Sequence, residues 1–135
     1  MDQLPKSRRS ENMRRIRSEH TLPELAVRRI VSALGYRYRL HGERLPGKPD
    51  LVFAGRRKAI FVHGCFWHQH RGCIDSHLPK SNRAYWKPKL QRNKQRDVSN
   101  KRQLTRLGWR YLVLWECQVK KTEAVSKRVA RFLTR

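Results

Sequence analysis

Three cysteines and one histidine of this sequence are well suited to bind one metal ion together: Cys65, His70, Cys73 and Cys117. The first three fall within nine positions of a polar, glycine-containing segment, and the fourth lies far along the chain. Four thiolate and imidazole ligands are typical of structural zinc sites, which are tetrahedral and closed. We therefore predict a zinc ion that pins this segment to the rest of the fold. His68 and His77 are alternative ligands, and a catalytic zinc or metal-free thiols are alternative interpretations.

Two carboxylates are candidates for a hydrolytic metal site. Asp50 follows Pro-Gly-Lys-Pro at the start of an apolar segment, in a chain with 10 Asp and Glu against 33 Lys and Arg. A carboxylate at a strand end can hold Mg²⁺ against a phosphate, where the metal stabilises developing charge. The alternative for Asp50 is an ordinary turn aspartate. Glu24 stands at capping-box spacing from Thr21, so helix capping is its alternative role.

His63 and His68 follow directly on the apolar run 59–62. An imidazole that titrates near neutral pH can accept a proton from water or bind a phosphate. Both histidines lie near Asp50 if the run 59–62 forms a hairpin with the strand that Asp50 opens. A single histidine is more often structural, but two beside a candidate metal site favour a catalytic role.

Aromatic and basic residues point to a nucleic-acid surface. Phe66, Trp67 and Trp86 lie among polar and cationic residues, where exposed rings stack on bases or wedge between them. Their alternative role is to cover the core beneath the loop. Residues 87–106 carry eight basic side chains against Asp97 alone, which favours contacts to backbone phosphates over a merely solvated helix face.

These side chains need a scaffold, which hydrophobic periodicity predicts. Thr21 and Gly35 bound the first helix, and the apolar run 59–62 is typical of a buried central strand. We expect the last strand, after a helical crossover, to lie parallel to that central strand. We assign Trp109 and Trp115 to the core. In chain order the predicted elements are helix 22–34, strands 36–40, 51–53 and 59–62, helix 87–107, strand 109–115 and helix 122–134, with a functional loop over 64–85.

Size and charge fit one small domain with a polyanionic partner such as nucleic acid. A chain of 135 residues supports one core, which we divide into a basic N-terminal segment 1–18 and a domain 19–135. The formal net charge of +23 favours a polyanionic partner, with a solvated surface or an anionic membrane as alternatives. The chain start carries no secretory apolar run and the cysteine count is odd, so we expect an intracellular protein without a membrane span.

The same residues resemble the very-short-patch-repair (Vsr) family of DNA mismatch endonucleases. The resemblance covers nearly the whole chain, and the block Phe-Val-His-Gly-Cys-Phe-Trp-His-Gln-His is highly specific. It implies an α/β, restriction-endonuclease-like single domain with a mixed central sheet flanked by helices. The segments that carry the resemblance are 12–18, 45–50, 61–73, 85–97 and 107–117.

The family resemblance implies Mg²⁺-dependent nicking of the T-containing strand beside T:G mismatches that arise from deaminated 5-methylcytosine. It implies Asp50 as the Mg²⁺ ligand, His68 as general base, and Glu24 and His63 as supporting groups. It also implies structural zinc on the Cys/His set named above. The DNA contacts that it implies are intercalation by Phe66, Trp67 and Trp86, a minor-groove approach near Met13, and a contact from Asn93.

The expected substrate, partner protein and location come from the same resemblance. The resemblance implies mismatched duplex DNA as substrate, a mismatch-repair partner such as MutL, and a cytoplasmic, nucleoid-associated location of bacterial type. A monomer suffices for cutting one strand. The alternatives are a related nuclease with a restriction-type target and a non-catalytic, zinc-stabilised DNA-binding module, which would need neither Asp50 nor His68.

Overall fold

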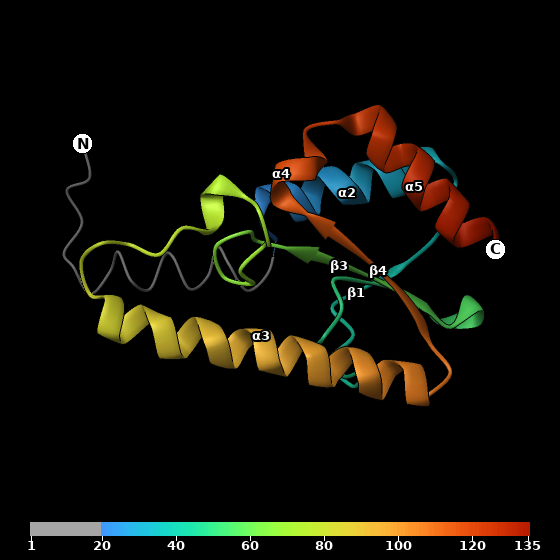
Figure 1. Cartoon of the computed structure of the whole chain (residues 1–135). Coiled ribbons are helices and arrows are strands. Elements are labelled where there is room, and N and C mark those ends of the chain that lie inside the picture. Colours follow the sequence, from blue (N-terminus) through green and yellow to red (C-terminus); the bar gives the residue numbers. More distant parts are fainter. Residues whose placement is uncertain (1–19) are drawn as a thin grey trace.

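A computed structural model of the chain describes residues 20–135. The basic segment 1–18, with Met13, lies outside the described residues, so the predicted division at residue 18 stays a prediction. Figure 1 labels the elements used below. They are α2 (Leu22–Ala33), β1 (Arg39–Leu40), β2 (Leu51–Phe53), β3 (Lys58–His63), α3 (Arg83–Arg106), β4 (Arg110–Trp115), α4 (Glu116–Val119) and α5 (Thr122–Thr134), with short 3-10 turns at Ala54–Arg56 and Ile74–Ser76.

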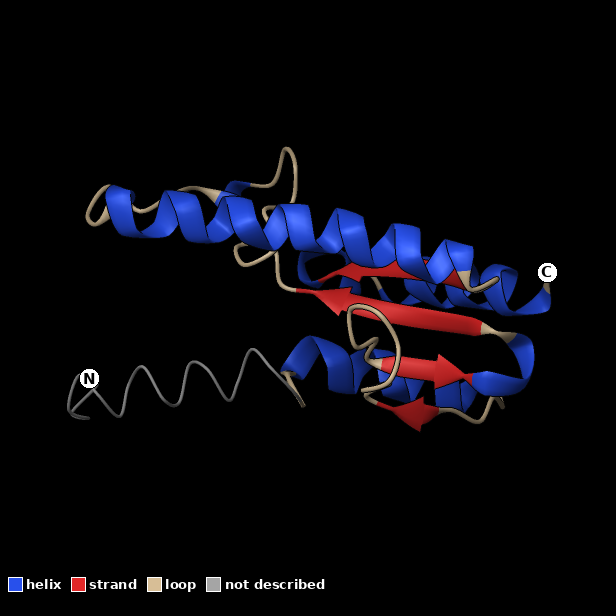
Figure 2. Ribbon diagram, turned by 90° about the horizontal axis from the view of Figure 1, so that it is seen from below, coloured by secondary structure: helices blue, strands red, loops and turns tan. Residues whose placement is uncertain are grey.

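The four strands form one mixed sheet in the order β1-β2-β3-β4 (Figure 2). The first three are antiparallel neighbours, and β4 runs parallel to β3. This parallel ladder extends from Lys58 opposite Arg110 to His63 opposite Trp115. The mixed sheet and the parallel last strand confirm the predicted α/β architecture, whereas its restriction-endonuclease-like assignment stays a prediction.

Helices cover both faces of the sheet (Figure 1). On one face, α2 and α5 pack over the sheet through buried side chains such as Val31, Ile60, Leu114 and Leu133. The long helix α3 crosses the other face, where Leu90 and Leu104 are buried. The side chains of Lys58 and Arg56 donate to carbonyl oxygens of the last turn of α5, which fastens this helix to the start of β3. No helix in the described part of the chain is long and apolar enough to cross a membrane.

Two predicted elements have other bounds in the structure. The strand expected over 36–40 extends over Arg39–Leu40, because these are the two residues that pair with β2. Helix α3 begins at Arg83 rather than at residue 87. Pro88 is of a type that favours helix starts, but here it is tolerated within the second turn of the helix. Pro88 has no N–H to donate to the carbonyl of Ala84, four residues earlier. Ala84 is exposed, so water can bind this carbonyl instead.

Trp109 and Trp115 are not core residues, as their strand position had suggested, but are half-buried. Trp109 precedes β4 and lines a surface pocket. Trp115 ends β4, and its ring stacks on His70 with centroids 4.2 Å apart and meets His63 edge-on at 5.2 Å. The strand pattern could not reveal that β4 lies at the edge of the sheet.

Candidate active site and metal centre

Asp50 and Glu24 form an acidic pair beside the start of β2. The hairpin of β2 and β3 places Asp50 opposite the end of β3, where its Oδ2 accepts a hydrogen bond of 2.6 Å from the backbone N–H of Val62. Burial, followed by the nearby charge and hydrogen bonding of Glu24, raises the pKa of Asp50 to about 7, against the opposing effect of the Val62 N–H. Two carboxylates this close together, one of them with a raised pKa, are suited to bind a divalent cation.

Glu24 takes part in the cap of its helix, and its carboxylate lies beside Asp50. Thr21 Oγ1 accepts the N–H of Glu24 at 3.2 Å, which confirms the predicted helix cap. The carboxylate is 1% exposed and is held by the Arg28 guanidinium and by His41 Nε2, at 3.1 Å from its Oε2. Its charge also faces Asp50. The cap uses the backbone N–H of Glu24, while its carboxylate, besides facing Asp50, accepts the backbone N–H of His20 at 3.2 Å.

His63, His68 and Asp97 form a second cluster at the end of β3. The two imidazole rings stack with centroids 3.8 Å apart and planes 11° from parallel. His68 Nδ1 lies 2.7 Å from Asp97 Oδ2, which reaches it from α3. An Nδ1–H that donates to this carboxylate leaves Nε2 as the basic nitrogen of a neutral ring. The arrangement can thus accept a proton at a defined atom.

His63 is a neutral group. Burial, then the charges of His68 and Lys101, lowers its pKa to about 2. Its side chain is 5% exposed, and its Nδ1 has no hydrogen-bond partner among the described residues. A buried imidazole nitrogen without a partner is costly unless a ligand completes it.

The four predicted metal ligands come together after β3 and β4. One ligand atom from each of Cys65, His70, Cys73 and Cys117 lies within 4.8 Å of all the others. A tetrahedral zinc ion, with bonds of about 2.3 Å to sulfur and about 2.0 Å to nitrogen, separates these two ligand types by about 3.5 Å. His70 Nδ1 lies 3.6 Å from Cys65 Sγ and 3.4 Å from Cys117 Sγ. The donor set and its spacing therefore fit zinc.

The alternative ligands lie outside this cluster. His68 pairs with Asp97, and His77 is exposed and does not join the metal-binding group. Cys65 is buried, and its backbone N–H donates to Glu116 Oε1 at 3.0 Å. The ring of His70, a second ligand, stacks on Trp115, and this contact orients it. Contacts of this kind hold metal ligands in place.

Phe66, Trp67 and Trp86 form one aromatic cluster, with ring centroids 5.1 to 5.4 Å apart. All three are half-buried, and none belongs to the hydrophobic core. Lys89 Nζ lies over the Trp67 and Trp86 rings at 5.8 and 5.7 Å from their centroids. The cluster thus joins the loop after β3 to the start of α3 and offers aromatic and cationic groups together.

Other contacts were not predicted. Asn93 Nδ2 donates to the carbonyl of Trp67 at 3.3 Å, so this amide supports the loop that carries the aromatic cluster. Asp97 was noted only as the single acid of a basic helix, which is the one signal that could have singled it out. Arg28 and His41, which hold Glu24, carried no signal in the sequence.

Comparison with known proteins places this geometry in a family. The family of the DNA mismatch endonuclease Vsr matches residues 1–74. The chain is 46% identical over 132 residues to the "Type II nicking enzyme V.XorIIP" of Xanthomonas oryzae, a match that covers 98% of this chain and 96% of that protein. It is 36% identical over 121 residues to the "DNA mismatch endonuclease Vsr" of Escherichia coli, covering 90% and 77%. The chain therefore belongs to the Vsr family of DNA mismatch endonucleases.

Proposed function

We propose that this protein nicks the T-containing strand of DNA beside T:G mismatches by Mg²⁺-dependent phosphodiester hydrolysis. Family membership supports a DNA endonuclease. The observation that carries the proposal is the convergence of two groups at one end of the sheet: the Asp50–Glu24 pair and the His68–Asp97 pair, beside the aromatic cluster. A binding module needs neither pair.

Asp50 is the residue that would hold Mg²⁺, with Glu24 next to it. The raised pKa of Asp50 fits this role, because a cation relieves the repulsion and burial that favour the protonated acid. Bound Mg²⁺ supplies charge stabilisation at the scissile phosphate and acidifies a water molecule. Arg28 and His41 keep the Glu24 carboxylate fixed toward this position.

His68 is our proposed general base. Asp97 holds the ring by its Nδ1–H and stabilises the positive charge that develops when Nε2 takes a proton from the attacking water. The stacked, uncharged His63 cannot supply a cation, so we assign it a supporting role, in which its ring holds the ring of His68 by stacking. The division gives one histidine to proton transfer and the other to holding that histidine in place.

We assign a structural role to zinc on the four Cys/His ligands, because a closed ligand set leaves no position for substrate. The ion would join the loop that bears His68 to the segment after β4. Phe66, Trp67 and Trp86 then present their rings for intercalation beside the mismatch, and basic side chains of α3 contact phosphates. Asn93 and Met13 are further proposed DNA contacts.

The decisive experiment compares duplexes that differ in one base pair. Purified protein with Mg²⁺ is incubated with T:G, C:G and T:A duplexes in several cytosine-methylation contexts. Nicking confined to the T strand of T:G duplexes supports the proposal. Asp50→Ala should abolish nicking while DNA affinity stays nearly intact, and nicking by this variant would refute the mechanism.

A second candidate is nicking of fully paired DNA at a restriction-type target. Relatives described as type II nicking enzymes, including one from Neisseria meningitidis at 39% identity over 127 residues, favour it. Cutting of the C:G and T:A duplexes would establish this alternative, and binding without any cutting would establish a zinc-stabilised binding module. As an enzyme that nicks beside T:G mismatches, the protein acts as a monomer inside a bacterial cell, with a mismatch-repair partner such as MutL.

A further inference from the structure

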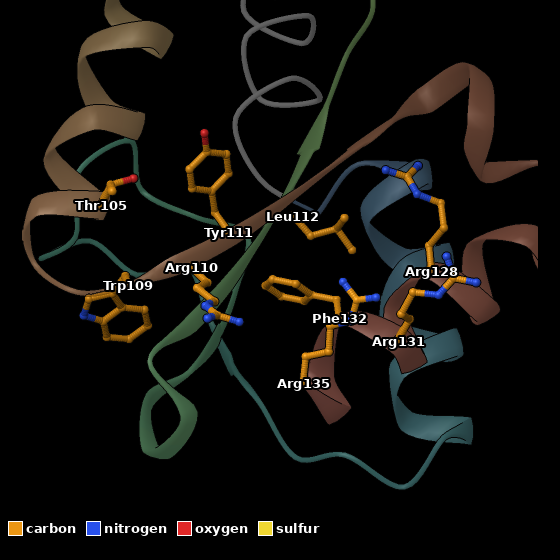
Figure 3. A pocket seen from close by; sticks show the side chains of 9 residues that line it. All are labelled: Thr105, Trp109, Arg110, Tyr111, Leu112, Arg128, Arg131, Phe132 and Arg135. Carbon is orange, nitrogen blue, oxygen red and sulfur yellow. The ribbon is translucent and has the colours of Figure 1, made fainter.

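A groove opens along β4 at the end of the strand pair opposite to the catalytic histidines. Its cavity of about 490 Å³ lies between the end of α3 and the helix α5 (Figure 3). Trp109, Tyr111 and Phe132 supply aromatic walls, and Arg128 and Arg131 stand on the α5 side. A volume of this size is within the usual range of ligand pockets. We call this hollow the β4 groove.

The β4 groove exposes the edge of the sheet. β4 is the last strand in the sheet order, and the consecutive residues Arg110, Tyr111 and Leu112 all line the cavity. Because alternate side chains of a strand point to opposite faces, three consecutive lining residues place the groove at the strand edge.

At this edge the backbone groups of Tyr111 face outward. Val113 O and Trp115 N point away from β3, since they bind the side chains of Arg128 and Gln118 at 3.4 and 3.2 Å. In a parallel strand every second residue directs its N–H and C=O to the same side, so those of Tyr111 also face outward. Tyr111 can therefore hydrogen-bond an extended chain that enters the groove.

The charged side chains that line the groove are all basic. A second hollow of about 430 Å³ shares Thr105 and Tyr111 with the first and continues along α3, past Lys101 and Arg102. No Asp or Glu is among the residues, all within the described part of the chain, that line these two hollows. Arg110, Arg128 and Arg131 are exposed, so their charges are available to a partner.

We propose that the β4 groove binds an acidic, extended peptide segment of a partner protein, which adds to the sheet edge at Tyr111. Carboxylates of the segment meet the arginines, its apolar side chains meet the aromatic walls, and its backbone bonds the strand. A second copy of this chain does not fit, because it would bring equal cationic charge. His63 and His68 lie at the other end of the β3–β4 pair from Trp109 and Arg110, so the peptide and the scissile phosphate meet different ends of this pair.

The test uses a fluorescein-labelled peptide of five Glu-Val repeats at physiological ionic strength, with fluorescence anisotropy as readout. Arg131→Glu should weaken binding about tenfold, while Arg29→Glu, an equal charge change on the exposed side of α2, should alter it less than about twofold. Both variants should nick DNA as the unmodified protein does. A Glu-Pro repeat, which lacks half the backbone donors, should bind more weakly than Glu-Val.

Hydrogen exchange provides the second readout. Saturating Glu-Val peptide should slow exchange at the Tyr111 amide, as strand addition requires. Equal losses of affinity in Arg29→Glu and Arg131→Glu, or unchanged exchange at Tyr111, would overturn the proposal in favour of general charge attraction. A ten-nucleotide oligo-dT that binds more tightly than the peptide and is lost in Arg131→Glu would assign the groove to single-stranded nucleic acid instead.

Discussion

Replacing Asp50 with asparagine removes a charge that the folded protein holds at a cost while keeping the shape of the side chain. The amide oxygen of asparagine still accepts the N–H of Val62, so the hairpin contact is retained. We predict that Asp50→Asn loses nicking yet makes the Mg²⁺-free protein more stable. The two effects have one cause, because the burial and the repulsion by Glu24 that make the charge costly in the metal-free fold are what a bound cation compensates.

The expected magnitude follows from the pKa of Asp50, which rises from 3.8 to about 7 in the fold. Three pH units correspond to about 4 kcal/mol, and partial exposure of this residue reduces the figure to about 2–4 kcal/mol. The sign is fixed by linkage. A raised carboxyl pKa means that the native state binds the proton more tightly, so the cost is absent below the unfolded pKa and is complete above the folded one.

Urea unfolding of both proteins between about pH 4 and pH 8 measures this difference. The buffers omit Mg²⁺ but contain no chelator, so that zinc is retained. Asp50→Asn should gain stability over the unmodified protein as pH rises, and added Mg²⁺ should stabilise the unmodified protein alone. Glu43→Gln, at an exposed carboxylate, is the matched control and should show no such gain. Parallel pH profiles of Asp50→Asn and the unmodified protein would refute the reasoning.

Three further predictions concern the other parts of the site. Asp97→Asn should slow single-turnover nicking by about 10- to 100-fold with unchanged DNA affinity, because His68 loses the carboxylate that orients it; unimpaired nicking would remove Asp97 from the mechanism. Cys117→Ser should lower both the zinc content, measured by elemental analysis, and the thermal midpoint, whereas full zinc retention would exclude Cys117 as a ligand. Trp67→Ala should weaken binding of mismatched duplex by about 1–3 kcal/mol in anisotropy titrations, and equal affinity would mean that this ring does not stack on bases.

Local sequence signals predicted the scaffold wherever the local preference and the packed structure agree. Thr21 and Gly35 bound α2, and the apolar run at 59–62 became the central part of β3. Helix α3 begins one turn before the expected residue 87 and carries Pro88 inside it, where local helix preference disfavours a proline. The burial of Trp109 depends on which strand lies at the sheet edge, and periodicity carries no information on strand order.

The site could be predicted where side-chain chemistry alone selects the group. Soft ligands are few in this chain, so Cys117 could be joined to the loop cysteines without knowledge of the fold. Asp97 and His41 are different, because a carboxylate or imidazole is unremarkable until the fold sets it against a partner 29 or 17 positions away. Sequence reasoning therefore singled out groups that can be recognised by residue type and missed the groups that hold them.

The parallel pairing of β3 and β4 has a consequence for how the chain folds. Lys58 and Arg110, which begin the ladder, lie 52 positions apart by their numbers, and so do Cys65 and Cys117. Closing a loop of that length costs about 4 kcal/mol of chain entropy before any strand contact forms. An ion that bridges the two cysteines early would close this loop before the strands pair, and its binding free energy would offset the entropy cost. The slow, non-local pairing step would then be faster. Zinc supply would then control how fast newly made chains mature, separately from how stable the finished enzyme is.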